Sequence, residues 1–156
     1  MNLQELSDRA ALEDLTSRLS YAQDDRDFAT FRALFTDVIL LEMFGVPLQE
    51  VAADDLTAKA ASTIPKWAFT QHWATNVLVE LDGDRATVRS NGTTYVHAPT
   101  EPGVADYCIT REYINLGCVR TDEGWLIDRV TIVRNAPAQG NYGVYTAAHR
   151  RGEDHA

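Results

Sequence analysis

Apolar positions recur with a helical period in the first part of the chain. Over residues 6–23 they fall at i, i+3, i+7 and i+10 and form one stripe, which consists of Leu12, Leu15, Leu19 and Ala22. Ser7 stands where an N-cap is expected, and Asp8 follows in the first turn. An acidic run over residues 24–27 comes directly after the stripe. The pattern therefore predicts an amphipathic helix over residues 6–23 that ends at the acidic run.

Shorter apolar segments follow before the period changes. A short second helix is predicted after the acidic run, with a buried face made of Phe28, Phe31, Leu34 and Phe35. The compact apolar run over residues 38–44 predicts a strand. Residues 53–64 predict another helix, because two aspartates stand in the first turn and Pro65 ends it.

The second half of the chain has a period of two, which is typical of strands. Strands are predicted over residues 70–81, 85–97, 106–120 and 125–135. Asp82-Gly83-Asp84 is typical of a hairpin turn, and residues 98–105 contain two prolines and predict a loop. The tail over residues 136–156 is polar at its end, and we expect it to be partly disordered.

The order of these elements predicts the fold class. Helices followed by a run of antiparallel strands are typical of an α+β fold, in which helices cover one face of a sheet. We expect a cone-shaped α+β barrel, with the N-terminal helices packed on a strongly curved, mostly antiparallel sheet. At 156 residues the chain fits one domain, which we place at residues 1–135.

Charge narrows the classes of partner. The formal net charge is −9, and no basic stripe is present, which disfavours nucleic acid and anionic membrane surfaces. No apolar run approaches the ~20 residues of a membrane span. Residues 1–8 lack the basic and apolar regions of a secretory signal. We therefore expect a cytoplasmic protein that acts on a small molecule.

One aspartate and two histidines are the candidates for chemistry. Asp24 lies at the end of the first predicted helix, 48 positions before His72, and His97 lies 25 positions after His72. Both histidines fall in predicted strands. If those strands are neighbours, three groups that carry or direct a proton converge in one pocket.

Three stretches resemble a known family. Residues 7–15, which lead without a gap to Asp24, are similar to the first helix of hexachlorocyclohexane dehydrochlorinase. Thr70-Gln71-His72 and His97 are similar to the two histidine positions of scytalone dehydratase, and Ile114-Asn115-Leu116 is similar to its asparagine segment. Over about residues 6–135 the chain thus resembles the nuclear transport factor 2-like superfamily in its SnoaL-like branch. That branch also includes bile-acid 7α-dehydratase and polyketide cyclases.

The resemblance implies a set of site residues. It implies catalytic roles for Asp24, His72 and His97, and a place for Asn115 in the substrate site. The chain departs from the family where other members carry tyrosines, and the substitutes are Leu19, Gln23 and Met43. Of these, Leu19 and Met43 are expected to bind the substrate. Tyr95 and Tyr113 are candidates to supply the missing hydroxyl. The resemblance also implies that no cofactor or metal is needed, and that the chain forms a homo-dimer or homo-trimer through the outer sheet face.

These residues suit general acid–base catalysis. A neutral imidazole has a pKa near ~6.5, which suits His72 as a base, and a carboxylate such as Asp24 would fix its tautomer. His97 would act as the acid that assists the leaving group. The expectation is a cofactor-independent lyase, dehydratase-like, acting on a small apolar cyclic substrate such as a polyketide, terpenoid or steroid.

Other interpretations of the same residues stay open. His72 could be a hydrogen-bonded core histidine, Asp24 part of a solvated acidic run, and His97 an exposed residue at a loop edge. Asn115 could simply satisfy the sheet interior. Two histidines and a carboxylate could also hold a metal. A polyketide cyclase or isomerase using the same pocket, or a non-catalytic small-molecule binding module, would share the fold.

Overall fold

The computed structural model describes residues 1–98 and 106–149. The helices are α1 (Leu3–Asp24), α2 (Phe28–Ala33), α3 (Ala53–Thr63), the 3₁₀ turn η1 (Ile64–Lys66) and α4 (Tyr142–His149). The strands are β1 (Phe35–Met43), β2 (Val46–Ala52), β3 (Phe69–Asp82), β4 (Arg85–His97), β5 (Tyr107–Thr121), β6 (Gly124–Arg134) and β7 (Gln139–Gly140).

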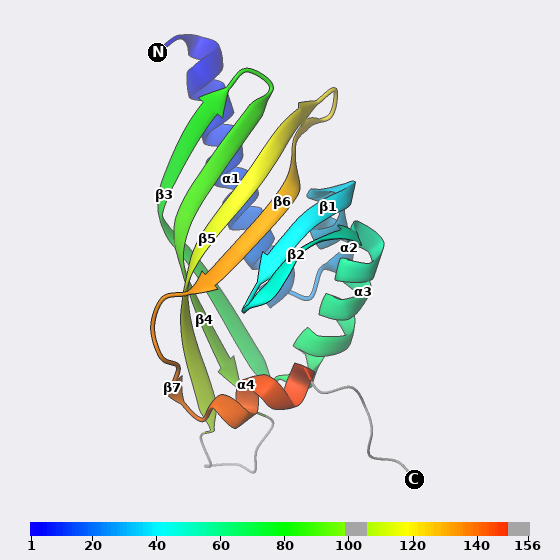
Figure 1. Ribbon diagram of the computed structural model, residues 1–156, viewed down its shortest axis with the longest axis vertical. Coiled ribbons are helices and arrows are strands. Elements are labelled where there is room, and N and C mark those ends of the chain that lie inside the picture. The colour runs from blue at the N-terminus through cyan, green and yellow to red at the C-terminus, as the bar shows by residue number, and fades with distance from the viewer. Residues whose placement is uncertain (99–105, 150–156) are drawn as a thin grey trace.

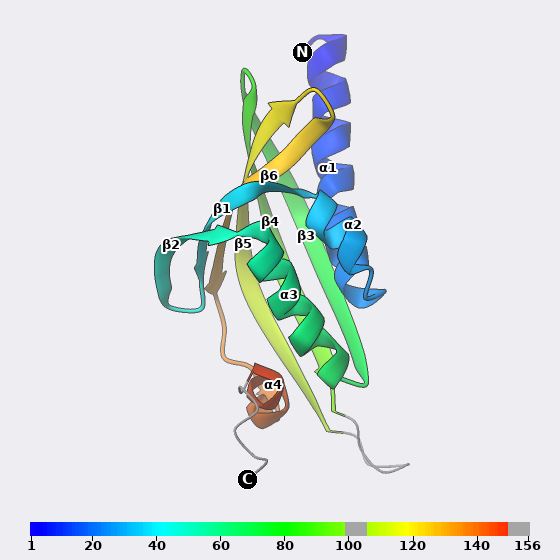
Figure 2. The same cartoon turned by 90° about the vertical axis from the view of Figure 1, so that its right-hand side faces the viewer.

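The strands form one sheet that is twisted but not closed. Its order is β2-β1-β6-β5-β4-β3, and β7 pairs with β5 beside this path. All pairs are antiparallel except β1 with β6, which is parallel. Figures 1 and 2 show the long strands β3–β6 twisting past α1, with α2 and α3 beside β1 and β2 and with α4 beside the far ends of β4 and β5. The arrangement confirms the predicted α+β class.

Alternating residues on the strands define two faces. The inner face of β4 and β5 carries buried side chains, which are Val88, Val96, Cys108, Leu116 and Cys118. The main core cluster joins this face to α1 through Leu12, Leu15 and Ala22, as the apolar stripe predicts. A second cluster surrounds Trp67 and includes Val144 of α4. Residues of the opposite parity form the outer face.

A bulge in β3 changes which residues face inward. The pairing of β3 with β4 shifts between Thr75 and Leu78, and Asn76 has a positive φ of 55°. Before the bulge His72 shares the inner face, whereas beyond it the buried position is Val79. A strict period of two over the whole strand would have placed one of these two on the wrong face.

Several predicted boundaries were wrong. The N-cap of α1 is Asn2, which forms a capping box with Glu5, and Ser7 lies inside the helix. Strand β2 and the described part of the tail, which forms β7 and α4, were not predicted. Val144 of α4 is buried, so the domain extends beyond residue 135.

Two predicted segments reach beyond the described residues. The loop predicted over residues 98–105 and the end of the tail, residues 150–156, lie almost entirely outside the described residues. Within the described part, no helix is both long enough and apolar enough to cross a membrane.

Candidate active site

Asp24 and His72 form a closely hydrogen-bonded pair. The Nδ1 atom of His72 lies 2.6 Å from Oδ1 of Asp24, and both side chains are about four-fifths buried, with 19% and 18% exposed. A carboxylate at this position accepts the Nδ1 proton, which leaves the lone pair on Nε2. Among the described residues, Nε2 has no hydrogen-bond partner. The pair therefore has the geometry of an oriented general base.

The end of α1 holds the carboxylate in place. Asp24 also accepts the backbone N–H of His72 at 2.8 Å and the hydroxyl of Thr70 at 3.3 Å. A carboxylate at a helix C-terminus is disfavoured by the helix dipole. Here donors from β3 offset that cost, because they satisfy both carboxylate oxygens.

A Schellman motif fixes the helix end beside Asp24. The N–H of Asp27 donates to the carbonyl of Ala22 at 2.9 Å, and that of Arg26 donates to Gln23 at 3.2 Å. Arg26 occupies the left-handed position with a φ of 58°, which glycine usually fills. Its guanidinium donates to the carbonyl of Trp67 at 3.0 Å and thereby joins the helix end to η1.

The structure does not bring His97 to this pair. His72 pairs with Thr94 across the sheet, and His97 is three positions further along β4, so the two histidines point to opposite faces. His97 lies on the outer face near the ring of Tyr95, at 6.4 Å, and its Nδ1 lies 2.9 Å from the carbonyl of Ala98. The expected convergence of three groups was wrong, because the bulge between Thr75 and Leu78 lies between His72 and the hairpin turn and shifts the register by one residue, which puts residues 25 apart on opposite faces.

The predicted substrate-binding residues divide between the two faces. Tyr95, Tyr113 and Asn115 share the outer parity, and Tyr113 is 55% exposed. Leu19 and Met43 are partly buried and pack against the main core on the inner side. Only Leu19 and Met43 are therefore on the same side of the sheet as His72.

A buried acid on β5 was missed. Glu112 lies on the inner face, paired with Gly92 of β4 and Arg134 of β6, and is only 3% exposed. Its Oε1 lies 3.9 Å from Nη2 of Arg134, which is an ion pair but too long for a hydrogen bond. Alternation along residues 106–120 could have found it, since Cys108, Glu112 and Leu116 share one parity.

Polar atoms around Glu112 are buried and unpaired. Within the described residues, Oε1 of Glu112, Oγ1 of Thr110, and Nε and Nη2 of Arg134 have no hydrogen-bond partner. An unsatisfied buried polar atom costs about 1–3 kcal/mol, so such a cluster calls for an explanation. These atoms mark a place on the inner face where buried polar groups lack partners within the described residues.

Aromatic rings surround the guanidinium of Arg134. Its Cζ lies 5.0 Å, 5.2 Å and 5.3 Å from the rings of Phe44, Tyr142 and Tyr145. An open pocket of about 450 Å³ adjoins it, lined by the β1–β2 hairpin, β6 and Tyr142. The pocket does not include Asp24 or His72. Arg134 thus lies between this pocket and Glu112.

The described residues contain no group of three histidine, cysteine, aspartate or glutamate side chains that could hold a metal. The only pair of the predicted triad that meets is Asp24 and His72. A facial triad made of Asp24, His72 and His97 therefore does not form.

Comparison with known proteins agrees with the fold. The family model of the SnoaL-like domain matches residues 4–131. No curated protein sequence matches significantly. The Kfla4162 protein of Kribbella flavida is 24% identical, with a TM-score of 0.79, and the match covers 85% of this chain and 93% of that one.

Two further solved structures are similar. A protein of Novosphingobium aromaticivorans, provisionally named a scytalone dehydratase, is 17% identical with a TM-score of 0.79, and the match covers 90% and 92% of the two chains. Hexachlorocyclohexane dehydrochlorinase LinA-type3 of Novosphingobium barchaimii LL02 is 18% identical with a TM-score of 0.73, covering 92% and 97%. The structural similarity to these proteins establishes a shared fold.

Proposed function

The chain belongs to the SnoaL-like domain family, and from that premise we propose that it is a cofactor-independent lyase of the dehydratase type. His72 is the general base and Asp24 orients it. The observation that carries the proposal is the 2.6 Å contact between Nδ1 of His72 and the Asp24 carboxylate, with Nε2 left free. Solved relatives named as a dehydratase and a dehydrochlorinase support elimination chemistry.

The reaction begins with removal of a proton from carbon. Nε2 of His72 takes a proton from a carbon next to a carbonyl, and the imidazolium that forms is stabilised by the Asp24 carboxylate. The electron pair of the broken C–H bond then forms a double bond, and the leaving group departs from the adjacent carbon. Asp24 keeps its negative charge throughout and acts as a positioning residue.

Apolar side chains support an apolar cyclic substrate. Leu19 and Met43 supply apolar surface on the inner side of the sheet, which is the side of His72. A small apolar ring with one carbonyl, such as a polyketide, terpenoid or steroid fragment, matches this lining. An isomerase or cyclase would begin with the same proton transfer.

The test is a panel of cyclic β-hydroxy ketones, with water loss followed by the absorbance of the enone. His72→Asn and Asp24→Asn are each expected to lower kcat by about 10²–10⁴-fold, the usual contribution of a positioned base. His97→Asn is the matched control, and it should retain activity because its ring is on the outer face. A protein that binds the panel without turnover, or variants that lose only stability, would identify a binding module instead.

A further inference from the structure

The inner face carries a second group suited to proton transfer. Glu112 and Thr110 are two residues apart on β5 and share the inner face. Thr110 pairs with Thr94 of β4, which pairs with His72 of β3. With strands about 4.8 Å apart and about 3.3 Å per residue, the Cα atoms of His72 and Glu112 are roughly 12 Å apart. The two side chains thus rise from the same face of the sheet, close enough for the charge of His72 to act on Glu112.

The row that contains Glu112 has only small residues toward β3. It runs from Ala74 through Gly92 to Glu112 and Arg134. Neither Ala74 nor Gly92 has a long side chain that could separate the carboxyl group from the ligand side of His72. A Cβ at position 92 would lie 2.6 Å from Cδ1 of Ile114 and 3.5 Å from Oε2 of Glu112, so glycine allows the Ile114 side chain and the Glu112 carboxyl group to approach this strand closely.

We propose that Glu112 is a catalytic residue of this site, the proton donor to the leaving oxygen of a hydroxylated substrate. The proposal rests on the proposed lyase function and deepens it, because it specifies a substrate whose leaving group needs a proton. The geometry that supports it is a carboxyl group nine-tenths buried or more, on the face of His72, with one oxygen unpaired among the described residues.

Every proton in the proposed reaction has a donor and an acceptor. His72 takes the carbon proton, the C–O bond breaks, and the proton of the Glu112 carboxyl group goes to the departing oxygen, which leaves as water. The Glu112 carboxylate that results is stabilised by Arg134, 3.9 Å away. Transfer of the His72 proton to solvent and reprotonation of Glu112 restore the site.

The electrostatics of Glu112 favour this role. Burial raises the pKa of Glu112, against smaller opposing effects of the Thr110 hydroxyl and of the charges of Arg134 and His72. A carboxylic acid with a raised pKa holds its proton closer to neutral pH, as a general acid requires.

The experiment compares two leaving groups. Glu112→Gln is assayed with 3-hydroxycyclohexanone, whose hydroxide must be protonated, and with 3-acetoxycyclohexanone, whose acetate need not be. We expect a 10²–10⁴-fold loss of kcat on the alcohol and less than about a tenfold loss on the acetate. Glu80→Gln, an exposed glutamate of β3, is the control and should change neither rate.

Other outcomes are assigned in advance. Equal losses on both substrates would overturn the proposal and indicate that Glu112 only holds Arg134. Wild-type rates on both would overturn it as well. Exchange of the α-proton in D₂O, followed by NMR, separates the two proposals, because it depends on His72 and not on Glu112. If both the His72→Asn and the Glu112→Gln variants still exchange the α-proton, the proposed function itself is rejected.

A measurement without substrate keeps the proposal testable. The protein labelled with ¹³C-glutamate is titrated by NMR, and the signal of Glu112 is assigned from its absence in Glu112→Gln. We expect a titration midpoint above the ordinary glutamate value of about 4.3. A midpoint at or below that value would overturn the role as proton donor.

Discussion

At the scale of single residues, parity decides which candidates can act together. His72 and His97 have the same chemistry, but only His72 shares the inner face with the carboxylate of Asp24. In the sequence, nothing distinguishes Glu112 from the other acidic residues of this acidic chain. Its burial and its register with Gly92 are what make it a candidate for the site.

Arg26, two positions after Asp24, allows a test of backbone strain. Arg26 has a φ of 58°, which costs a non-glycine residue about 1–2 kcal/mol. We predict that Arg26→Gly is more stable than Arg26→Ala by about 1 kcal/mol, because both lose the bond to Trp67 and only glycine relieves the strain. Urea unfolding measures the difference. Equal stability of the two variants would show that the helix end relaxes when the side chain is removed.

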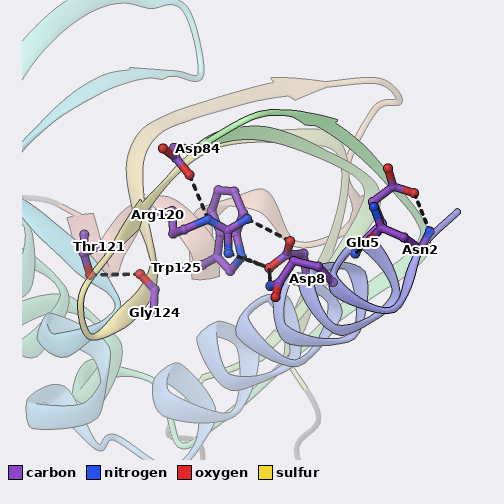
Figure 3. Close-up of polar contacts among 9 residues, drawn as sticks. Asn2, Glu5, Asp8, Asp84, Arg120, Thr121, Gly124 and Trp125 are labelled. Atoms are coloured by element: carbon purple, nitrogen blue, oxygen red, sulfur yellow. Dashed lines mark hydrogen bonds and ion pairs between the residues drawn. The ribbon is translucent and has the colours of Figure 1, made fainter.

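At the scale of elements, a buried network fastens α1 to the sheet. Arg120 of β5 donates to both oxygens of Asp8 at 2.7 Å and 2.8 Å, and Nε1 of Trp125 donates to Asp8 at 3.1 Å (Figure 3). The guanidinium of Arg120 also lies 4.4 Å from the Trp125 ring. The sequence places Asp8 in the first turn of the predicted helix but does not reveal its distant partners.

This network predicts a pH dependence of stability. The hydrogen bonds from Arg120 hold the pKa of Asp8 well below its usual range. A depressed folded-state pKa contributes stability that is present above the unfolded value of about 3.9 and is lost as pH falls through the folded value. We therefore expect the stability difference between wild type and Asp8→Asn to be largest at neutral pH and to shrink below about pH 4.

Urea unfolding at several pH values measures this difference. Glu13→Gln, an exposed acid of the same helix, is the control and should show no such trend. A difference between wild type and Asp8→Asn that stays constant between about pH 7 and about pH 3 would contradict the assignment of the effect to Asp8 ionisation.

At the scale of the whole molecule, the outer face exposes aromatic side chains. Phe69, Trp73, Tyr107 and Tyr113 are 48%, 41%, 39% and 55% exposed, and the ring of Tyr95 lies 5.8 Å from both Phe69 and Tyr107. Apolar patches of this kind mark association surfaces. We propose that a second copy of the chain covers this face, since a symmetric pair buries the same patch on both copies.

The oligomeric state tests this proposal. Light scattering after size exclusion should give a dimer or trimer for the wild type and a smaller species for the double variant Phe69→Lys, Tyr113→Lys. Leu6→Lys, an exposed site on α1, is the control and should leave the mass unchanged. A monomeric wild type would reject the assembly.

The sequence by itself indicated α1, α2, α3, β1 and β3–β6 and their order, and its family resemblance indicated a site that contains Asp24 and His72. Periodicity is a local property, so the stripe of α1 and the alternation of β3–β6 could be read directly. The resemblance placed Asp24 and His72 at catalytic positions, and the structure places the two side chains 2.6 Å apart.

Only the tertiary structure decided which face each side chain occupies and what surrounds it. The bulge at Asn76 changes which alternate residues of β3 face inward, and no residue type in the sequence indicates it. The register of β3, β4 and β5 separated His97 from His72 and placed Glu112 and Arg134 on the inner face. α4 became visible only through its packing on Trp67. Register and packing depend on contacts between distant segments, which local patterns do not encode.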